Sequence, residues 1–330
     1  MDKSTLTHIT RRTTLAGLTA LGANAFLPRR ASAQGTMPLI LGIIGPTVEY
    51  YPIFVAQKKG YFEAEDVALD LVTTGSSANS AQMVAADAIN IGSSSWLDTV
   101  RGVAGGAPLV IVASSLVNAT TMMLGAKDIT SVEQLKGKRV SVGGAKDITM
   151  VWWSALAEQN GLHPTEDVEV IFGGGTSARF GALAGGAVQA AAVATPLAFT
   201  AIQEGYNNLG VLGPLLPNVP YMTWHANRAW AEANPETVKA FIRAHSKAID
   251  FLYDPANREE AIDILVESTQ ASADEAALTH DLVVEIQGFK EGSEFAMADV
   301  EGVIALLADW GDVDATLAAD TIGDTSYLAQ

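Results

Sequence analysis

The chain has 330 residues, no cysteine and a formal net charge of -17 at pH 7. The absence of cysteine excludes disulfides, thiol catalysis and cysteine-ligated metals, and the acidic charge argues against nucleic acid and anionic membranes as partners. Because 48% of the residues are hydrophobic, an apolar core without disulfides can hold such a chain together.

The N-terminal segment has the three parts of an export signal. Arg11 and Arg12 form a twin-arginine pair, residues 13–28 carry no charge, and a small-residue cleavage signal ends at Ala33. The uncharged stretch is shorter than the roughly 20 residues of a membrane span. We therefore expect a Tat-type signal peptide over residues 1–33, cleaved near Ala33, and a periplasmic mature protein. The alternative is an uncleaved amphipathic helix.

The mature chain would keep 297 residues and a formal charge of -21, because the signal segment carries a net charge of +4. One compact core rarely holds so many residues, so two lobes are expected. No integral membrane segment is expected in the mature chain.

Short apolar runs alternate with helical patterns over the first two thirds of the mature chain. A helix is expected over residues 51–59, ending at Gly60. The alternation predicts an α/β fold with parallel sheets and crossover helices. The expected strands cover residues 38–45, 68–73, 89–92, 109–113, 139–142, 168–172 and 190–193.

The last third of the chain has a mainly helical pattern. Asn234-Pro235-Glu236 is typical of a helix start with proline in the first position, and Asp254-Pro255 interrupts the pattern. The sequence also shows a weak internal similarity, because residues 84–91 resemble residues 183–190. In both, a helix end rich in small residues turns quickly into a strand. Either the chain has two similar lobes, or alanine-rich stretches match by chance.

Four motifs occur in an order that resembles a known family. Residues 52–62 (PIFVAQKKGYF) are similar to its opening P-x-x-V-A-x-x-x-G-Y-F, and residues 135–140 (LKGKRV) to its L-K-G-K-x-V. Thr195-Pro196 and residues 234–238 (NPETV) match two further positions. The family comprises the periplasmic substrate-binding proteins of ABC importers for alkanesulfonates, taurine, nitrate and thiamine pyrimidines.

The resemblance implies a type II periplasmic-binding fold, in which two lobes surround a central cleft and are joined by two hinge crossings. Lobe 1 would comprise residues 34–120 and 222–330, and lobe 2 residues 121–221. The crossings would lie near residues 118–125 and 221–227. The implied partners are a small-molecule ligand and the ABC permease and ATPase subunits, with the chain itself a monomer. No cofactor and no metal is implied.

Two departures from the family pattern bear on the ligand. Asn90 and Gln189 stand where the family often has acids, and residues 143–148 (GGAKDI) lack the hydroxyl group usual in that loop. A direct transfer of sulfonate or nitrate as the ligand is therefore in doubt.

Loops that follow the expected strands supply polar candidates for the cleft. Ser94 and Ser95 precede a helix, whose N-terminus suits an anion, although ordinary helix capping would use the same residues. Arg179 lies in the first turn of another helix and either holds an acid group or faces solvent. The full set of polar candidates is Ser76, Ser94, Ser95, Asn118, Asp147, Thr176, Arg179 and Thr195.

Aromatic residues supply the apolar wall that ligand pockets need. Trp152 and Trp153 are consecutive on a helix and cannot face the same way, so we expect Trp152 to face the cleft; the alternative is that both lie in the core. The aromatic candidates are Tyr50, Tyr51, Trp96, Trp152 and Trp224. Together with Arg179 they predict a small organic anion with a planar or aromatic part. If Asp147 faces the cleft, the ligand instead carries an amine, as an aminopyrimidine or taurine does.

Catalysis is the less favoured class of function. The histidines are scattered, and the chain has no H-x-x-x-H and no G-x-S-x-G pattern. A pyrimidine synthase of similar fold is expected to need a cysteine-rich motif, which this chain lacks. We therefore expect no catalytic residues, and a solute-binding subunit rather than an enzyme.

Overall fold

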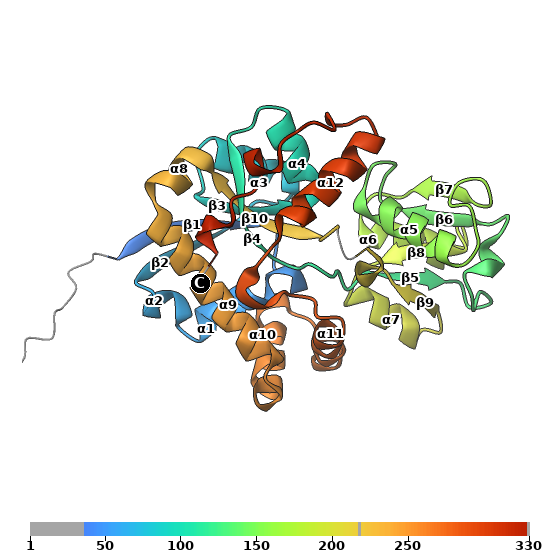
Figure 1. The fold of residues 1–330 in the computed structure, drawn as a ribbon. Helices are drawn as coiled ribbons and strands as arrows, with labels where there is room; N and C mark the ends of the chain where they lie inside the picture. Colours follow the sequence, from blue (N-terminus) through green and yellow to red (C-terminus); the bar gives the residue numbers. More distant parts are fainter. Residues whose placement is uncertain (1–35, 217–218, 329–330) are drawn as a thin grey trace, which may run out of the picture. The chain divides into compact units, whose positions relative to one another are not determined.

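The structure is a computed structural model and describes residues 36–216 and 219–328 (Figure 1). The predicted signal peptide and its cleavage site lie outside these residues. The described chain forms two five-stranded sheets with helices packed on both faces, which confirms the expected α/β class.

The first sheet has the strand order β2-β1-β3-β10-β4. β1 runs parallel to β2 and β3, whereas β10 is inserted antiparallel between β3 and β4. A strand from the last third of the chain therefore completes a sheet built by its first third. The strands are β1 (Met37–Ile43), β2 (Val67–Thr73), β3 (Ile91–Ser95), β4 (Leu109–Ser114) and β10 (Met222–Asn227).

The second sheet repeats this plan in the order β7-β6-β8-β5-β9. β6 is parallel to β7 and β8, and β5 is antiparallel to β8 and β9. Both sheets are thus mixed, and the expectation of parallel sheets is wrong for the β5 and β10 pairings. The strands are β5 (Met122–Gly125), β6 (Arg139–Val142), β7 (Glu169–Phe172), β8 (Ala190–Val193) and β9 (Asn207–Val211).

Helices cover both faces of the first sheet. α3 and α4 pack on one side, and α1, α2 and α9 on the other (Figure 1). In the second sheet, α5 contacts β6, and α6 contacts both β6 and β8. The helices are α1 (Tyr51–Lys58), α2 (Tyr61–Ala64), α3 (Ser77–Ala85), α4 (Trp96–Ala104), α5 (Ile148–Gln159), α6 (Thr176–Ala184), α7 (Leu197–Gln203), α8 (Arg228–Ala233), α9 (Pro235–Tyr253), α10 (Arg258–Thr269), α11 (Ala273–Glu285) and α12 (Met297–Asp309).

Short 3₁₀ turns connect several of these elements. η1 joins β1 to α1, and η3 follows β9 close to the start of β10. The turns are η1 (Val48–Tyr50), η2 (Glu133–Leu135), η3 (Gly213–Leu215), η4 (Pro255–Asn257), η5 (Glu291–Ser293), η6 (Ala319–Thr321) and η7 (Thr325–Tyr327).

Two helix boundaries confirm their sequence signals. α9 begins at Pro235, and its face with Phe241 and Ile249 is wholly buried. α1 ends before Gly60, whose φ of 68° lies in the left-handed region that favours glycine. Asp254 ends α9 and caps η4, so the interruption expected there is present.

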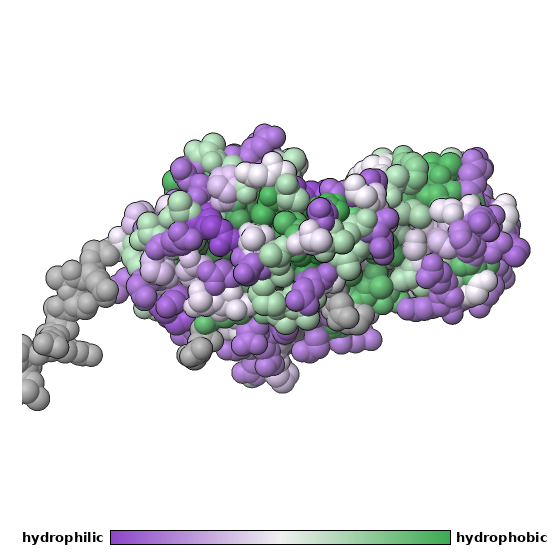
Figure 2. Space-filling model, turned by 45° about the horizontal axis from the view of Figure 1, so that its top comes forward, coloured by the Kyte–Doolittle hydropathy of each residue, from purple (hydrophilic) through white to green (hydrophobic). Residues whose placement is uncertain are grey.

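The surface mixes hydrophilic and apolar residues, with hydrophilic residues widely spread over the face in Figure 2. None of the helices within residues 36–216 and 219–328 is both long and apolar enough to cross a membrane.

Candidate ligand-binding site

The carboxyl ends of the central strands mark where an α/β sheet binds its ligand. β1 ends at Ile43 and β3 at Ser95 in the first sheet, whereas β6 ends at Val142 and β8 at Val193 in the second. The loops that leave these four strands line two cavities, and the β1–α1 loop contributes to both.

The first cavity has a volume of about 310 Å³ and is lined by segments from both sheets. Ile44 follows β1, and Ser95 ends β3. The loop after β6 contributes Lys146 and Asp147, and Tyr221 comes from the segment before β10. The other lining residues are Ser77, Leu97, Asp98, Arg101, Gly144, Ile148 and Met222. The cavity therefore has the lining expected of a cleft between two sheets.

The second cavity has a volume of about 370 Å³. It is lined by Pro46 and Val48 from the β1–α1 loop, and by Thr195 and Pro196 from the segment after β8. Its remaining wall comes from the end of α10 and from α11.

A larger cavity of about 630 Å³ lies elsewhere, against Val117, Asn118 and Pro220 and the connection between α11 and α12. None of these segments follows the carboxyl end of a parallel strand. Its size alone does not make it a ligand site, and we place the candidate site in the first cavity.

Tyr221 lines the first cavity and has an unusual polar environment. The indole ring of Trp152 meets its ring edge-on, with the ring centroids 5.3 Å apart. Burial raises the pKa of the Tyr221 hydroxyl, and the nearby charge of Glu49 raises it further. Trp152 Nε1 and Glu49 Oε2 are buried atoms without a hydrogen-bond partner among residues 36–216 and 219–328. Neither residue lines the cavity, and both Trp152 and Trp153 lie in the buried core, the alternative considered for this pair.

Arg179 lies near the same tyrosine and is only 6% exposed. Its guanidinium group donates to the carbonyl oxygens of Gly174 and Ala192 and, over 3.1 Å, to Thr176 Oγ1. Burial lowers the pKa of Arg179, and the negative charge of Asp147 opposes this shift. Within the described part of the chain, Arg179 has no ion pair with a carboxylate. Solvent exposure, the alternative considered for Arg179, is therefore wrong.

Three of the expected polar residues begin helices and cap them. Ser76 Oγ accepts from the backbone N–H of Asn79, and Ser95 Oγ from that of Asp98. Asp147 Oδ1 accepts from the backbone N–H of Thr149 over 2.9 Å. Ser95 and Asp147 also line the first cavity, so capping and ligand contact are compatible for both.

The other expected polar residues bond within the protein. Ser94 is fully buried, and its hydroxyl lies 2.6 Å from Thr99 Oγ1. Thr195 Oγ1 lies 2.7 Å from Thr120 Oγ1, and Asn118 Nδ2 donates to the carbonyl of Ile286. A ligand role for these residues stays a prediction, as it does for Ser76.

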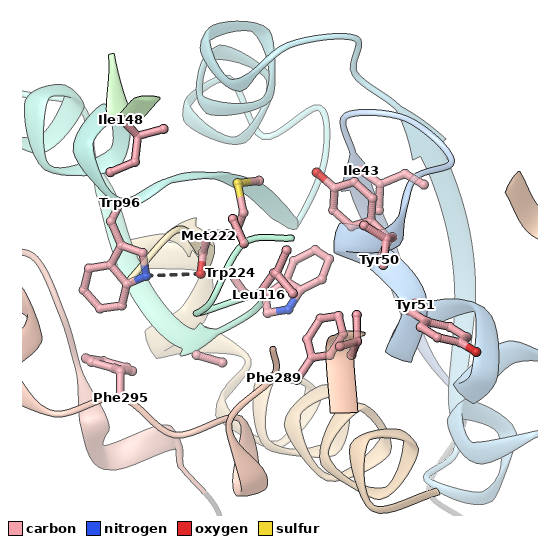
Figure 3. Close-up of a cluster of buried hydrophobic side chains, with 14 of the residues drawn as sticks. Ile43, Tyr50, Tyr51, Trp96, Leu116, Ile148, Met222, Trp224, Phe289 and Phe295 are labelled. Atoms are coloured by element: carbon pink, nitrogen blue, oxygen red, sulfur yellow. Dashed lines mark hydrogen bonds between the residues drawn. The ribbon is translucent and has the colours of Figure 1, made fainter. Parts of the chain in front are cut away.

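Four expected aromatic residues lie in the buried core (Figure 3). Trp96 Nε1 donates to the carbonyl of Met222 over 3.1 Å, and Trp224 Nε1 donates to His245 Nε2 over 3.3 Å. The hydroxyl of Tyr51 lies 3.1 Å from His280 Nδ1, and the hydroxyl of Tyr50 accepts from the backbone N–H of Ile44. Their polar atoms therefore have protein partners, in contrast to Trp152 Nε1.

Glu49 and Tyr221 were not expected from the sequence. Glu49 stands between the first strand and the first helix, a position that usually faces a cleft, and Tyr221 begins the second crossing. These positions in the sequence could have indicated both residues as candidates for the site. What the sequence could not show is that the Tyr221 ring meets Trp152.

Comparison with known proteins agrees with this geometry. The sequence profile described as NMT1/THI5 like matches residues 47–258. The chain belongs to the NMT1/THI5-like family. A search of curated proteins gives no match to the sequence.

Solved structures share the fold of this NMT1/THI5-like protein. The periplasmic aliphatic sulphonate binding protein SsuA from Escherichia coli is 19% identical with a TM-score of 0.69, and the match covers 89% of this chain and 94% of that one. The periplasmic nitrate-binding protein NrtA from Synechocystis PCC 6803 is 17% identical with a TM-score of 0.66, covering 89% and 87%.

A third match is the alkanesulfonate-binding protein SsuA from Xanthomonas axonopodis pv. citri bound to MOPS. It is 17% identical with a TM-score of 0.66, and covers 88% of this chain and all of that one. At these identities the likeness establishes the fold, and it confirms the type II periplasmic-binding architecture expected from the motifs.

Proposed function

We propose that this chain is the extracytoplasmic solute-binding subunit of an ABC importer. The observation that carries the proposal is the cavity of about 310 Å³, lined by loops at the carboxyl ends of strands from both sheets. Membership of the NMT1/THI5-like family supports it, as does the structural likeness to the periplasmic sulphonate-binding and nitrate-binding proteins. The histidines favour binding over catalysis, because His225 and His245 are fully buried and His163 is exposed.

Capture would occur by closure of two lobes around the cavity. We propose residues 34–120 and 222–330 as one lobe and residues 121–221 as the other, with hinges at the two crossings. A ligand that contacts both lobes favours their closed arrangement, because only this arrangement offers all contacts at once.

The implied partners are the permease and ATPase subunits of the importer, with the chain acting as a periplasmic monomer. Export through a cleaved Tat signal over residues 1–33 supplies that location. N-terminal sequencing of protein recovered from the periplasm tests this step, and a mature N-terminus far from Ala33 contradicts it.

For the ligand we propose a small organic acid with a planar part. Trp152 and Arg179 are the residues that support this choice, because Trp152 Nε1 lacks a partner and Arg179 lacks a counter-ion among the described residues. Both groups suit an acid, and the indole face suits a flat body. Asp147 lines the cavity of about 310 Å³ and favours an amine on the ligand instead.

Native mass spectrometry of protein purified without refolding tests the function directly. A co-purified small molecule, together with a smaller radius of gyration for the ligand-saturated protein, is the expected result. A radius unchanged at saturation contradicts closure, and chemical turnover of the bound compound contradicts a pure binding role.

A further inference from the structure

A chain of polar side chains is buried under the first sheet, on the face that α3 and α4 cover (Figure 1). The side chains of Ser94, Thr99, Thr223 and His225 are all fully buried. Thr99 Oγ1 lies 2.6 Å from Ser94 Oγ and 3.2 Å from Thr223 Oγ1, and His225 Nδ1 lies 3.3 Å from Ser94 Oγ. Because bulk solvent does not reach them, these groups need partners inside the protein.

The number of protons fixes the direction of the hydrogen bonds along this chain. Thr99 Oγ1 donates its only proton to the carbonyl oxygen of Ser95 over 3.0 Å, because a carbonyl oxygen can only accept. Ser94 must then donate to Thr99, and His225 Nδ1 must donate to Ser94. Burial lowers the pKa of His225 to about 3, so the ring is neutral and has a single N–H. Its Nε2 therefore has a lone pair that needs a donor.

Two atoms at the end of this chain have no hydrogen-bond partner among the residues that the structure describes. They are His225 Nε2 in β10 and Ser80 Oγ in α3, and both side chains are fully buried. A Cβ atom added to Gly92 in β3 would lie 2.6 Å from Ser80 Oγ and 3.1 Å from His225 Nε2. Both polar atoms thus lie on the same side of Gly92. They are close enough for one water molecule, which forms hydrogen bonds of about 2.8–3.0 Å, to reach both.

We propose that one buried water molecule bridges Ser80 Oγ and His225 Nε2 beside Gly92. The hydroxyl group of Ser80 donates to the water, and the water donates to Nε2. Each of the two atoms then has the partner that its burial requires, because an unpaired buried polar group is costly. The bridge ties α3 to β10, the strand from the last third of the chain that completes the first sheet.

A high-resolution crystal structure of the wild-type protein tests the site directly. We expect one water molecule within about 3.2 Å of both Ser80 Oγ and His225 Nε2. A direct hydrogen bond between the two side chains, or an absence of solvent density between them, would overturn the proposal.

Nitrogen-15 NMR of the histidine rings tests the direction of the hydrogen bonds. At neutral pH, His225 should have a protonated Nδ1 and an unprotonated Nε2, because Nε2 accepts from the water. A protonated Nε2 contradicts the proposed bridge.

Ser80→Ala tests the contribution of the bridge to stability. It removes one of the two partners of the water, so the melting temperature should fall by about 2–4 °C. Ser177→Ala removes an exposed hydroxyl group in α6 and should change the melting temperature by less than about 1 °C. If Ser80→Ala melts at or above the wild-type temperature, the Ser80 hydroxyl group has no partner to lose and the proposal is wrong. None of these measurements needs a ligand, so they test the water site independently of the binding function.

Discussion

Lys146 and Asp312 form an ion pair that joins the loop after β6 to the segment after α12. Arg101 strengthens this contact from α4, because it pairs with Asp312 over 2.9 Å and donates to the backbone carbonyl of Lys146. Lys146 and Arg101 hold the pKa of Asp312 below its usual range. Lys146 and Arg101 line the candidate cavity, so this contact lies at its edge.

Loss of this ion pair should weaken ligand binding. Lys146→Met is expected to raise the dissociation constant of the co-purified ligand by about two- to fivefold, because a solvent-exposed pair contributes modestly. The effect should shrink in high salt, where such charges are screened. Calorimetric titration at two ionic strengths measures it.

Lys58→Met is the matched control for this variant. Lys58 pairs with Glu267 away from the cavity, and its side chain is 54% exposed, as is that of Lys146. Equal losses of affinity in the two variants would contradict a role of Lys146 in closure.

Ligand binding should change the fluorescence of one tryptophan of the consecutive pair in α5. Trp152 packs against Tyr221, which lines the candidate cavity, whereas Trp153 Nε1 donates to the carbonyl of Pro164 over 2.9 Å. Trp152→Phe should therefore abolish most of the ligand-induced emission change, and Trp153→Phe should leave it. A signal that disappears only in Trp153→Phe would place the ligand elsewhere.

Acid should destabilise the protein below about pH 6.5, because burial lowers the pKa of both His225 and His245 to about 3. Between these values the unfolded chain binds protons that the folded chain does not, so stability is present above pH 6.5 and is lost as the pH falls toward 3. At pH 5 each histidine should cost about 2 kcal/mol of unfolding free energy.

His245 has a visible reason to stay neutral. Its Nε2 accepts from Trp224 Nε1, and its Nδ1 lies 2.6 Å from Ser293 Oγ. Urea unfolding at pH 7.5 and pH 5 should show a smaller pH dependence for His245→Gln than for the wild type. His163→Gln, an exposed control, should keep the wild-type dependence; an unchanged dependence in His245→Gln would refute this assignment.

Gly213 should tolerate no side chain, because η3 packs there against the backbone of the first crossing. A Cβ atom at this position would lie 2.2 Å from the backbone nitrogen of Ala119, which cannot move independently. Gly213→Ala should lower the free energy of unfolding by about 1–3 kcal/mol, as overpacking of a close contact does. In contrast, Gly181→Ala in α6 meets no atom within 4 Å and should stabilise the protein by about 0.5–1 kcal/mol. Denaturant titration distinguishes the two variants, and equal effects on the free energy of unfolding would be evidence against the close contact between Gly213 and Ala119.

Much of the fold could be predicted from local patterns. The strands at Arg139–Val142 and Ala190–Val193 have the expected bounds, and the helix that begins at Pro235 follows its capping signal. β9 was not expected, because Asn207–Val211 contains residues of low strand propensity and forms a strand only through its pairing with β5.

The internal similarity between residues 84–91 and 183–190 also has a structural counterpart. Asn90 exchanges two hydrogen bonds with the backbone of Ile40 in β1, through its own N–H and its side-chain oxygen. Gln189 makes the same two bonds to Arg139 in β6. The residues that replace the family's usual acids thus serve an identical purpose in the two sheets, which explains why the two segments look alike.

The candidate site shows the limit of sequence reasoning. Composition, motif order and the alternation of strands and helices determined the class of fold and the loops that border the cleft, because these depend on residues near one another in the chain. The sequence could not decide that Trp224 faces the core, that Trp152 packs against Tyr221, or that Glu49 lies near enough for its charge to act on Tyr221. These side chains come from three distant segments, and only the tertiary packing decides which of their polar atoms find a hydrogen-bond partner within the protein.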